Sequence, residues 1–268
     1  FEAKALYGAL RNSLPPLALI ATLFFVGKEP LIVVATYFIS TAAVAWFCYR
    51  DVLRRFTPHN QTDDATLAFG KHLSVMNIID TLSGQADRII TFTLLGGTAL
   101  AVYSFVEVIP DQIRGLGSIV GTLALPKMSK TPLAELKQTL PRKFFILMAL
   151  SVASVGVYIA VAPIFFKTFF PVYLSAVPYS QWYSLCILGL PGVLFNRALV
   201  GHMRNAELYW LKGASATFRI VSLTYLVHLY GLWGVVVATI LYYLFTGVLL
   251  AALFFTAKDP TQKDLVTL

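Results

Sequence analysis

The sequence predicts an all-α protein, a polytopic bundle of transmembrane helices. Of its 268 residues, 57% are hydrophobic and only 13% are charged, and the mean hydropathy is +0.73. Apolar windows of about 20 residues, the length that crosses a bilayer as a helix, recur along the chain. A soluble domain does not need this much apolar surface, so the composition indicates a membrane protein.

We expect about eight membrane spans. They cover 14–27, 31–49, 73–95, 98–122, 144–163, 179–201, 213–230 and 233–256. Fifteen Lys and Arg residues fall in the loops on one side and only Lys28 and Lys167 in those on the other. Because short loops rich in Lys and Arg stay in the cytoplasm, we expect a multi-pass protein of the cytoplasmic membrane with both ends of the chain inside.

The connections suggest how the spans are grouped. Short glycine-containing turns at 27–30, 96–97 and 230–233 each join two neighbouring spans on the outer side. The cytoplasmic stretch 50–72 is the most polar and is predicted to link two bundles. The chain is therefore divided into residues 1–65, with two helices and the linker, residues 66–256, with a six-helix bundle, and residues 257–268, a cytoplasmic tail.

The hairpin formed by the spans 73–95 and 98–122 carries six charges in apolar surroundings. They are Asp80, Asp87, Arg88, Glu107, Asp111 and Arg114. A charge at the centre of a bilayer costs at least about 3 kcal/mol. The polar residues of each span recur at steps of three and four, which puts them on one helix face. The hairpin therefore predicts a polar cavity inside the bundle.

The turn at 96–97 allows the charges to be matched by depth. Residues of the two antiparallel helices lie at equal depth when their numbers sum to about 193. This rule predicts one pair between Asp80 and Arg114 and a second between Arg88 and Glu107. Two acids are left over: Asp87 and Asp111.

Other residues in the spans bear on the cavity. Arg219 lies about two turns inside its span and is expected to add positive charge, whereas Arg197 is closer to the cytoplasmic end and is expected to extend to the interface. Three glycines are expected to let another helix approach closely: Gly115, Gly117 and Gly121.

Two stretches resemble polysaccharide-biosynthesis flippases, which export lipid-linked O-antigen and capsule repeat units and belong to the multidrug/oligosaccharidyl-lipid/polysaccharide exporter superfamily. One resembles their seventh and eighth helices, and the tail resembles their eleventh and twelfth. The motifs are Asp87-Arg88, Gly96-Gly97, Ala101 to Ser104, then Pro126, Ser129 and Lys130, and in the tail Tyr230, Gly231 and Gly234.

The resemblance implies a two-lobe bundle of twelve or more helices that works by alternating access. This chain would hold the last two helices of the first lobe and all six of the second, and because it starts at Phe1 we expect a fragment without the first four. The implied substrate is an undecaprenyl-pyrophosphate-linked oligosaccharide for cell-surface polysaccharide, including lipopolysaccharide. The implied partners are membrane lipids, an H+ or Na+ coupling ion and a glycan polymerase complex.

The charges suggest roles in such transport. A diphosphate needs cationic partners, and arginine offers planar bidentate donors. We expect Arg88, Arg114 and Arg219 to bind it. The four acids are expected to balance these arginines, or one of them to carry the coupling ion: Asp80, Asp87, Glu107 and Asp111.

Several alternatives stay open. The charges can be structural ion pairs only, or belong to a cation-coupled multidrug or metabolite antiporter. An integral-membrane glycan polymerase or ligase is a weaker alternative, because the longest outer loop, 164–178, holds only Lys167 as a charge. The chain shows no enzyme motif and no metal-ligand spacing, and its basic residues sit in loops between apolar spans, so we expect no enzyme, metal, cofactor or nucleic-acid partner. Cys48 and Cys186 fall in spans and are expected to be packing residues.

Overall fold

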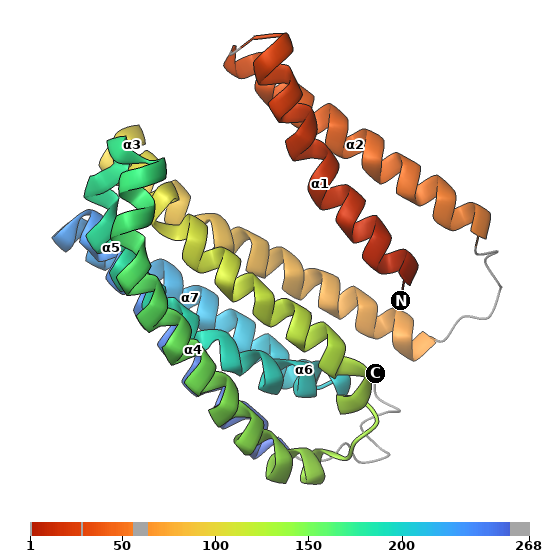
Figure 1. The fold of residues 1–268 in the computed structure, drawn as a ribbon. Helices are drawn as coiled ribbons and strands as arrows, with labels where there is room; N and C mark the ends of the chain where they lie inside the picture. Colours follow the sequence, from red (N-terminus) through yellow and green to blue (C-terminus); the bar gives the residue numbers. More distant parts are fainter. Residues whose placement is uncertain (1, 28, 56–63, 258–268) are drawn as a thin grey trace. The chain divides into compact units, whose positions relative to one another are not determined.

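The computed structural model describes residues 2–27, 29–55 and 64–257, which form helices and turns and contain no strand. The all-α class is therefore confirmed for these residues. The chain divides into two compact units, Phe1–Thr62 and Asp63–Leu268 (Figure 1). The middle of the predicted linker, 56–63, and nearly all of the predicted tail, 258–268, lie outside the described residues.

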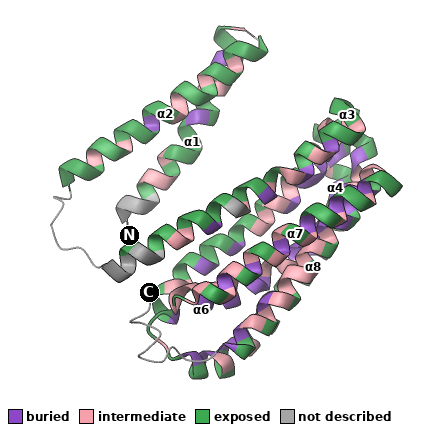
Figure 2. Cartoon of the chain, turned by 180° about the vertical axis from the view of Figure 1, so that it is seen from behind, coloured by how far each residue is buried: buried purple, intermediate pink, exposed green. Residues whose placement is uncertain are grey.

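The first unit is a hairpin of α1 (Glu2–Phe25) and α2 (Pro30–Arg55). The chain leaves α1 through Gly27, whose φ of 148° suits glycine. The Tyr7 hydroxyl donates to Asp51 Oδ2 at 2.6 Å, which ties the open end of the hairpin. Most apolar side chains of this pair are exposed within the unit (Figure 2). Apolar surface of this extent marks a face that lipid or other protein covers.

The second unit begins with α3 (Asp64–Met128), which consists of two arms. At Gly96 the backbone leaves helical geometry, with φ 83° and ψ 177°, a conformation open in practice only to glycine. We call residues 64–95 the first arm and 97–128 the second arm. They run antiparallel and side by side (Figure 1), and the Arg88–Glu107 ion pair joins them. The predicted hairpin turn is therefore present.

Seven further elements complete the unit. They are α4 (Leu133–Phe169), the 3₁₀ helix η1 (Pro171–Ala176), α5 (Val177–Tyr183), the 3₁₀ helix η2 (Ser184–Gly192), α6 (Val193–Gly201), α7 (Asn205–Tyr230) and α8 (Leu232–Thr256). Gly231, with φ 57°, forms the predicted turn between α7 and α8. The predicted outer loop 164–178 is instead largely helical, because α4 continues to Phe169 and η1 follows almost directly.

The helical run from η1 to α6 changes from α-helix to 3₁₀ helix in its middle, at η2. Pro191 has no N–H to donate, and it stands between Gly189 and Gly192 in η2. A 3₁₀ segment inside a longer helical run often marks a hinge or a strained sequence. Here Leu190 of η2 packs against Gly117 on the second arm of α3, and Gly189 and Gly192 of η2 lie against Tyr243 and Leu250 of α8.

Two apolar clusters hold the second unit together. One includes Leu140, Phe195, Leu208 and Phe254, and the other includes Tyr103, Phe166, Tyr183, Leu223 and Val235. Along α7 and α8, the segments of the two clusters are separated by the stretches that carry the polar residues. The polar site therefore lies between two apolar layers.

Five helical stretches are long and apolar enough to cross a membrane. They are Pro30–Arg55, Gly70–Met128, Leu133–Phe169, Pro171–Gly201 and Leu232–Thr256. The outward faces of the second unit are also apolar and exposed, as for Phe145 and Val248 (Figure 2). These features indicate a membrane protein. Because α1 and α7 are not among the five, the count of eight spans stays a prediction.

Candidate functional site

Six of the seven predicted site residues line one cavity in the second unit. The cavity measures about 410 Å³ and lies among both arms of α3, α5, α7 and α8. Its charged wall consists of Arg88, Arg114 and Arg219 together with Asp87, Glu107 and Asp111. Three cations thus face three anions, and we call this space the paired cavity. Asp80 does not line it.

The pair between Arg88 and Glu107 joins the two arms of α3 as the depth rule predicted. Arg88 Nε donates to Glu107 Oε1 at 2.9 Å, and Arg88 Nη2 bonds the same oxygen. The Glu107 side chain is only 6% exposed, whereas that of Arg88 is 49% exposed. The arginine therefore offers its free edge to the cavity while it neutralises a buried carboxylate.

Asp87, which the depth rule leaves without a partner on the neighbouring arm of α3, has an ionic partner on α7. Arg219 Nη2 donates to Asp87 Oδ2 at 3.0 Å. The Tyr103 hydroxyl donates to the same oxygen at 2.8 Å, and the backbone N–H of Arg88 donates to Oδ1 at 3.0 Å. The Asp87 and Arg219 side chains are 4% and 9% exposed. A buried carboxylate with this many donors satisfies the usual requirement for a charge inside a protein.

The predicted pair between Asp80 and Arg114 is wrong. Arg114 Nη1 donates to Asp111 Oδ1 at 2.7 Å on its own helix, so Asp111 is not left over either. The Arg114 guanidinium lies over the Tyr243 ring of α8, with Cζ 3.7 Å from the ring centre, in a cation–π contact. Asp80 instead forms an ion pair with Lys212 of α7. Depth matching gives the level of a residue but not the direction in which it faces.

Lys212 is one of the fifteen basic residues predicted to lie in cytoplasmic loops, and its ion pair with Asp80 was not predicted. The two ion pairs between α3 and α7, Asp80–Lys212 and Asp87–Arg219, have the same sequence separation of 132. Equal separations mean that the first arm of α3 and α7 run parallel at this contact. Both acids stand on α3 and both bases on α7, seven residues apart, which is two helical turns. This shared spacing of seven residues is the sequence feature that could have predicted the two pairs.

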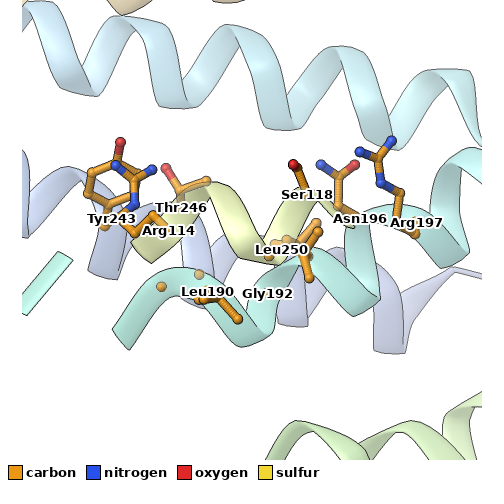
Figure 3. Close-up of a pocket in the computed structure, with 13 residues that line it drawn as sticks. Arg114, Ser118, Leu190, Gly192, Asn196, Arg197, Tyr243, Thr246 and Leu250 are labelled. Atoms are coloured by element: carbon orange, nitrogen blue, oxygen red, sulfur yellow. The ribbon is translucent and has the colours of Figure 1, made fainter. Parts of the chain in front are cut away.

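A second cavity of about 250 Å³ adjoins the paired cavity. It lies among the second arm of α3, η2, α6 and α8, and both cavities include Arg114 and Tyr243 in their walls. Figure 3 shows Arg197 and Asn196 at the other end from Arg114 and Tyr243. None of the described residues that line it is Asp or Glu, so we call it the acid-free cavity.

No family model, curated protein or solved structure matches this chain. The family resemblance therefore stays an expectation based on motifs.

Arg197 was expected to extend to the membrane interface, but its side chain lines the acid-free cavity. Its Nε is buried and has no hydrogen-bond partner. The position of Arg197 follows from close helix packing at two of the three glycines. A Cβ on Gly117 would lie 2.9 Å from Leu190 Cγ, and one on Gly121 would lie 2.8 Å from Arg197 Nε. At Gly115 a Cβ would meet nothing within 4 Å, so close approach is confirmed for Gly117 and Gly121 only.

The aromatic part of the site was missed from the sequence. Tyr183 of α5 donates to Asp111 Oδ1 at 3.3 Å, and Tyr243 separates the two cavities beneath Arg114. In the sequence, both tyrosines lie in apolar spans, and nothing around them distinguishes them from other tyrosines in such spans. Among the described residues, no group of three His, Cys, Asp or Glu side chains is placed to hold a metal ion.

Proposed function

We propose that the chain is part of a flippase of the cytoplasmic membrane that moves a lipid-linked oligosaccharide outward by alternating access, for cell-surface polysaccharide biosynthesis. One observation carries the proposal: three arginines line a single cavity between apolar helices. The undecaprenyl diphosphate of such a substrate would meet Arg88, Arg114 and Arg219 there. The lipid tail would remain in the bilayer outside the bundle, and both ends of the chain would lie in the cytoplasm.

The exposures of the arginines rank them for this role. The Arg88 side chain is 49% exposed, that of Arg114 is 23% exposed, and that of Arg219 is 9% exposed. A phosphate can reach Arg88 first and Arg114 next, without breaking the buried Asp87–Arg219 pair. In this proposal Arg219 holds the wall together and contributes its charge at a distance.

The paired carboxylates provide a reason for ion coupling. A phosphate that binds the free nitrogens of Arg88 and Arg114 adds negative charge beside Glu107 and Asp111 and competes with them for the two guanidinium groups. A carboxylate that loses its guanidinium partner in a low-dielectric site needs a cation or a proton. Uptake of H+ or Na+ by one of these acids would therefore accompany binding of the anion, while Asp80 and Asp87 keep their partners on α7.

The alternatives are less well supported by the same geometry. A cation antiporter needs carboxylates that are open to a cationic substrate, whereas Asp87, Glu107 and Asp111 each contact an arginine. A membrane polymerase or ligase needs reactive groups in an outer segment, and residues 164–178 are mostly helix with Lys167 as the single charge.

The decisive experiment changes Arg88 and Arg114 to alanine, separately, in the intact transporter in cells. Loss of one bidentate contact to phosphate should reduce glycan export by roughly 10- to 100-fold. Lipid-linked precursor should accumulate while membrane insertion stays normal. The control is Arg142→Ala, because Arg142 is exposed on α4. Export within two-fold of the parent in both variants would eliminate the diphosphate-binding role.

A further inference from the structure

The acid-free cavity holds positive charge that nothing in its wall neutralises. Arg114 and Arg197 line it, without any Asp or Glu. Arg114 is shared with the paired cavity, where Asp111 binds one of its nitrogens. Among the described residues, Arg197 forms no ion pair, and its Nε is buried without a partner. This Nε packs against Gly121, so only the two terminal nitrogens of Arg197 can face a ligand. They form no hydrogen bond with the described residues, so the positive charge of Arg197 is left for an anion to neutralise.

Four side chains bring hydrogen-bond donors to this cavity. Arg197 and Asn196 lie at one end, and Arg114 and Tyr243 at the other (Figure 3). The Asn196 amide forms no hydrogen bond with the described residues, which leaves its N–H groups available. The two hydroxyls nearby are already engaged: Ser118 donates to the Gly115 carbonyl at 2.7 Å, and Thr246 donates to Ser215 Oγ at 3.2 Å.

The size of the cavity limits what can bind. Its volume of about 250 Å³ is below the roughly 300–1,000 Å³ of pockets that take drug-sized ligands. Leu190, Val193 and Leu250 make the remaining wall apolar. The space therefore suits a compact, highly charged group and not an oligosaccharide. Guanidinium groups match the oxygens of phosphate in a bidentate geometry.

We infer that the acid-free cavity is a binding site for a small oxyanion of the phosphate class. Arg197 and Asn196 hold it at one end, and Arg114 contributes from the other. The inference does not rest on the proposed export, because it uses only the charge, donors and size of this cavity. The oxyanion has two potential sources: inorganic phosphate or diphosphate from water, or the diphosphate headgroup of a polyprenyl lipid.

The test uses the full chain in nanodiscs of phosphatidylcholine, a lipid without net charge. Titration calorimetry with inorganic diphosphate should show saturable binding, and Arg197→Gln should weaken it at least about 10-fold through the loss of charge-assisted hydrogen bonds. Arg142→Gln, an exposed arginine on α4, should bind like the parent. A parallel arm measures binding of a polyprenyl diphosphate placed in the nanodisc.

The two arms separate the sources. Binding of inorganic diphosphate that depends on Arg197 supports a soluble ligand, and Arg197-dependent binding of the lipid alone supports the headgroup. Binding of neither probe, or equal binding by Arg197→Gln, overturns the site. In the export experiment, Arg88→Ala tests the paired cavity alone, because Arg88 does not line the acid-free cavity, whereas Arg114 lines both cavities. Export by Arg88→Ala and diphosphate binding by Arg197→Gln therefore report on the two proposals separately.

A second variant keeps the charge of Arg197 but displaces its side chain. Gly121→Ala would place a Cβ 2.8 Å from both Arg197 Nε and Val193 Cγ2, which forces Arg197 out of position. We expect the affinity for inorganic diphosphate to fall about 10-fold, comparable to the loss of one charge-assisted contact. Gly156→Ala on α4, where a Cβ meets nothing within 4 Å, should leave the affinity unchanged. Parent-like binding by Gly121→Ala, in a protein that elutes and melts normally, contradicts the role of Arg197.

Discussion

The two cavities share Arg114 and Tyr243 but differ in whether their arginines are paired with carboxylates. In the paired cavity every arginine contacts a carboxylate, whereas in the acid-free cavity Arg197 contacts none among the described residues. Buried ion pairs satisfy each other, and removing one partner is far more damaging than removing both. The difference teaches that the number of charges in a membrane span does not by itself identify a ligand site. Whether each charge has an oppositely charged partner is more informative about a ligand site.

The largest effect should come from the most buried pair of the paired cavity. Asp87→Ala leaves the Arg219 guanidinium unpaired at 9% exposure and removes the acceptor of the Tyr103 hydroxyl. Loss of one partner of a buried pair costs about 3–5 kcal/mol of the unfolding free energy. Thermal unfolding in detergent should show a large drop in the midpoint. Adding Arg219→Met to this variant should recover part of the loss, and no recovery would mean that the pair is not coupled.

Replacing a single arginine by methionine should change the stability of the protein differently in the two cavities. Arg88→Met strands the buried Glu107 carboxylate, so we expect a loss of stability of about 2–3 kcal/mol. Arg197→Met removes a buried N–H that has no acceptor, so the unfolding midpoint should stay the same or rise. Both are measured without added anion. A larger loss in Arg197→Met than in Arg88→Met would contradict the assignment of the two cavities.

Two neighbouring glycines on α3 test how the wall of the acid-free cavity is packed. Gly117→Ala would put a Cβ 2.9 Å from Leu190 Cγ, and we expect a loss of roughly 1–2 kcal/mol from overpacking. Gly115→Ala meets nothing within 4 Å and should be neutral or stabilising by up to about 1 kcal/mol from helix propensity. The two unfolding midpoints should therefore move in opposite directions. Similar midpoints would show that η2 yields at Leu190.

The smallest effect should come from the pair outside both cavities. The Asp80 and Lys212 side chains are 40% and 22% exposed, and partly exposed pairs contribute about 0–1 kcal/mol. Asp80→Lys and Lys212→Asp should each destabilise slightly through like charges, and the double exchange should restore the midpoint. A double-mutant cycle measures this coupling. An additive result would mean that the two side chains do not interact.

The fold was predictable where local chemistry decides it. Each of the three tight turns contains a glycine with positive φ: Gly27, Gly96 and Gly231. The Arg88–Glu107 pair was predictable because both residues stand within about three turns of Gly96, where errors in helical register stay small. The cavity between the charged helices was expected from the one-face spacing of the polar residues.

The remaining contacts depend on packing that the sequence does not display. Asp80 and Arg114 stand further from the turn, and their directions are set by Lys212 of α7 and Tyr243 of α8. Arg197 was placed by its distance from a predicted span end, which ignores the 3₁₀ segment η2. Leu190 of that segment packs against Gly117, and Val193 and Arg197 of α6 pack against Gly121. Hydropathy does not report such contacts.

The two ion pairs between the first arm of α3 and α7 also have a mechanical consequence. A slide of α7 along α3 by one helical turn, about 5.4 Å, would leave Asp87 beside Ser215 or Leu223 and Asp80 beside Leu208 or Ala216. Both acids would lose their cations at once, because the pairs share one separation of 132. The buried Asp87–Arg219 pair therefore opposes such a slide, whereas the partly exposed Asp80–Lys212 pair adds little to that resistance. We expect the two helices to move together.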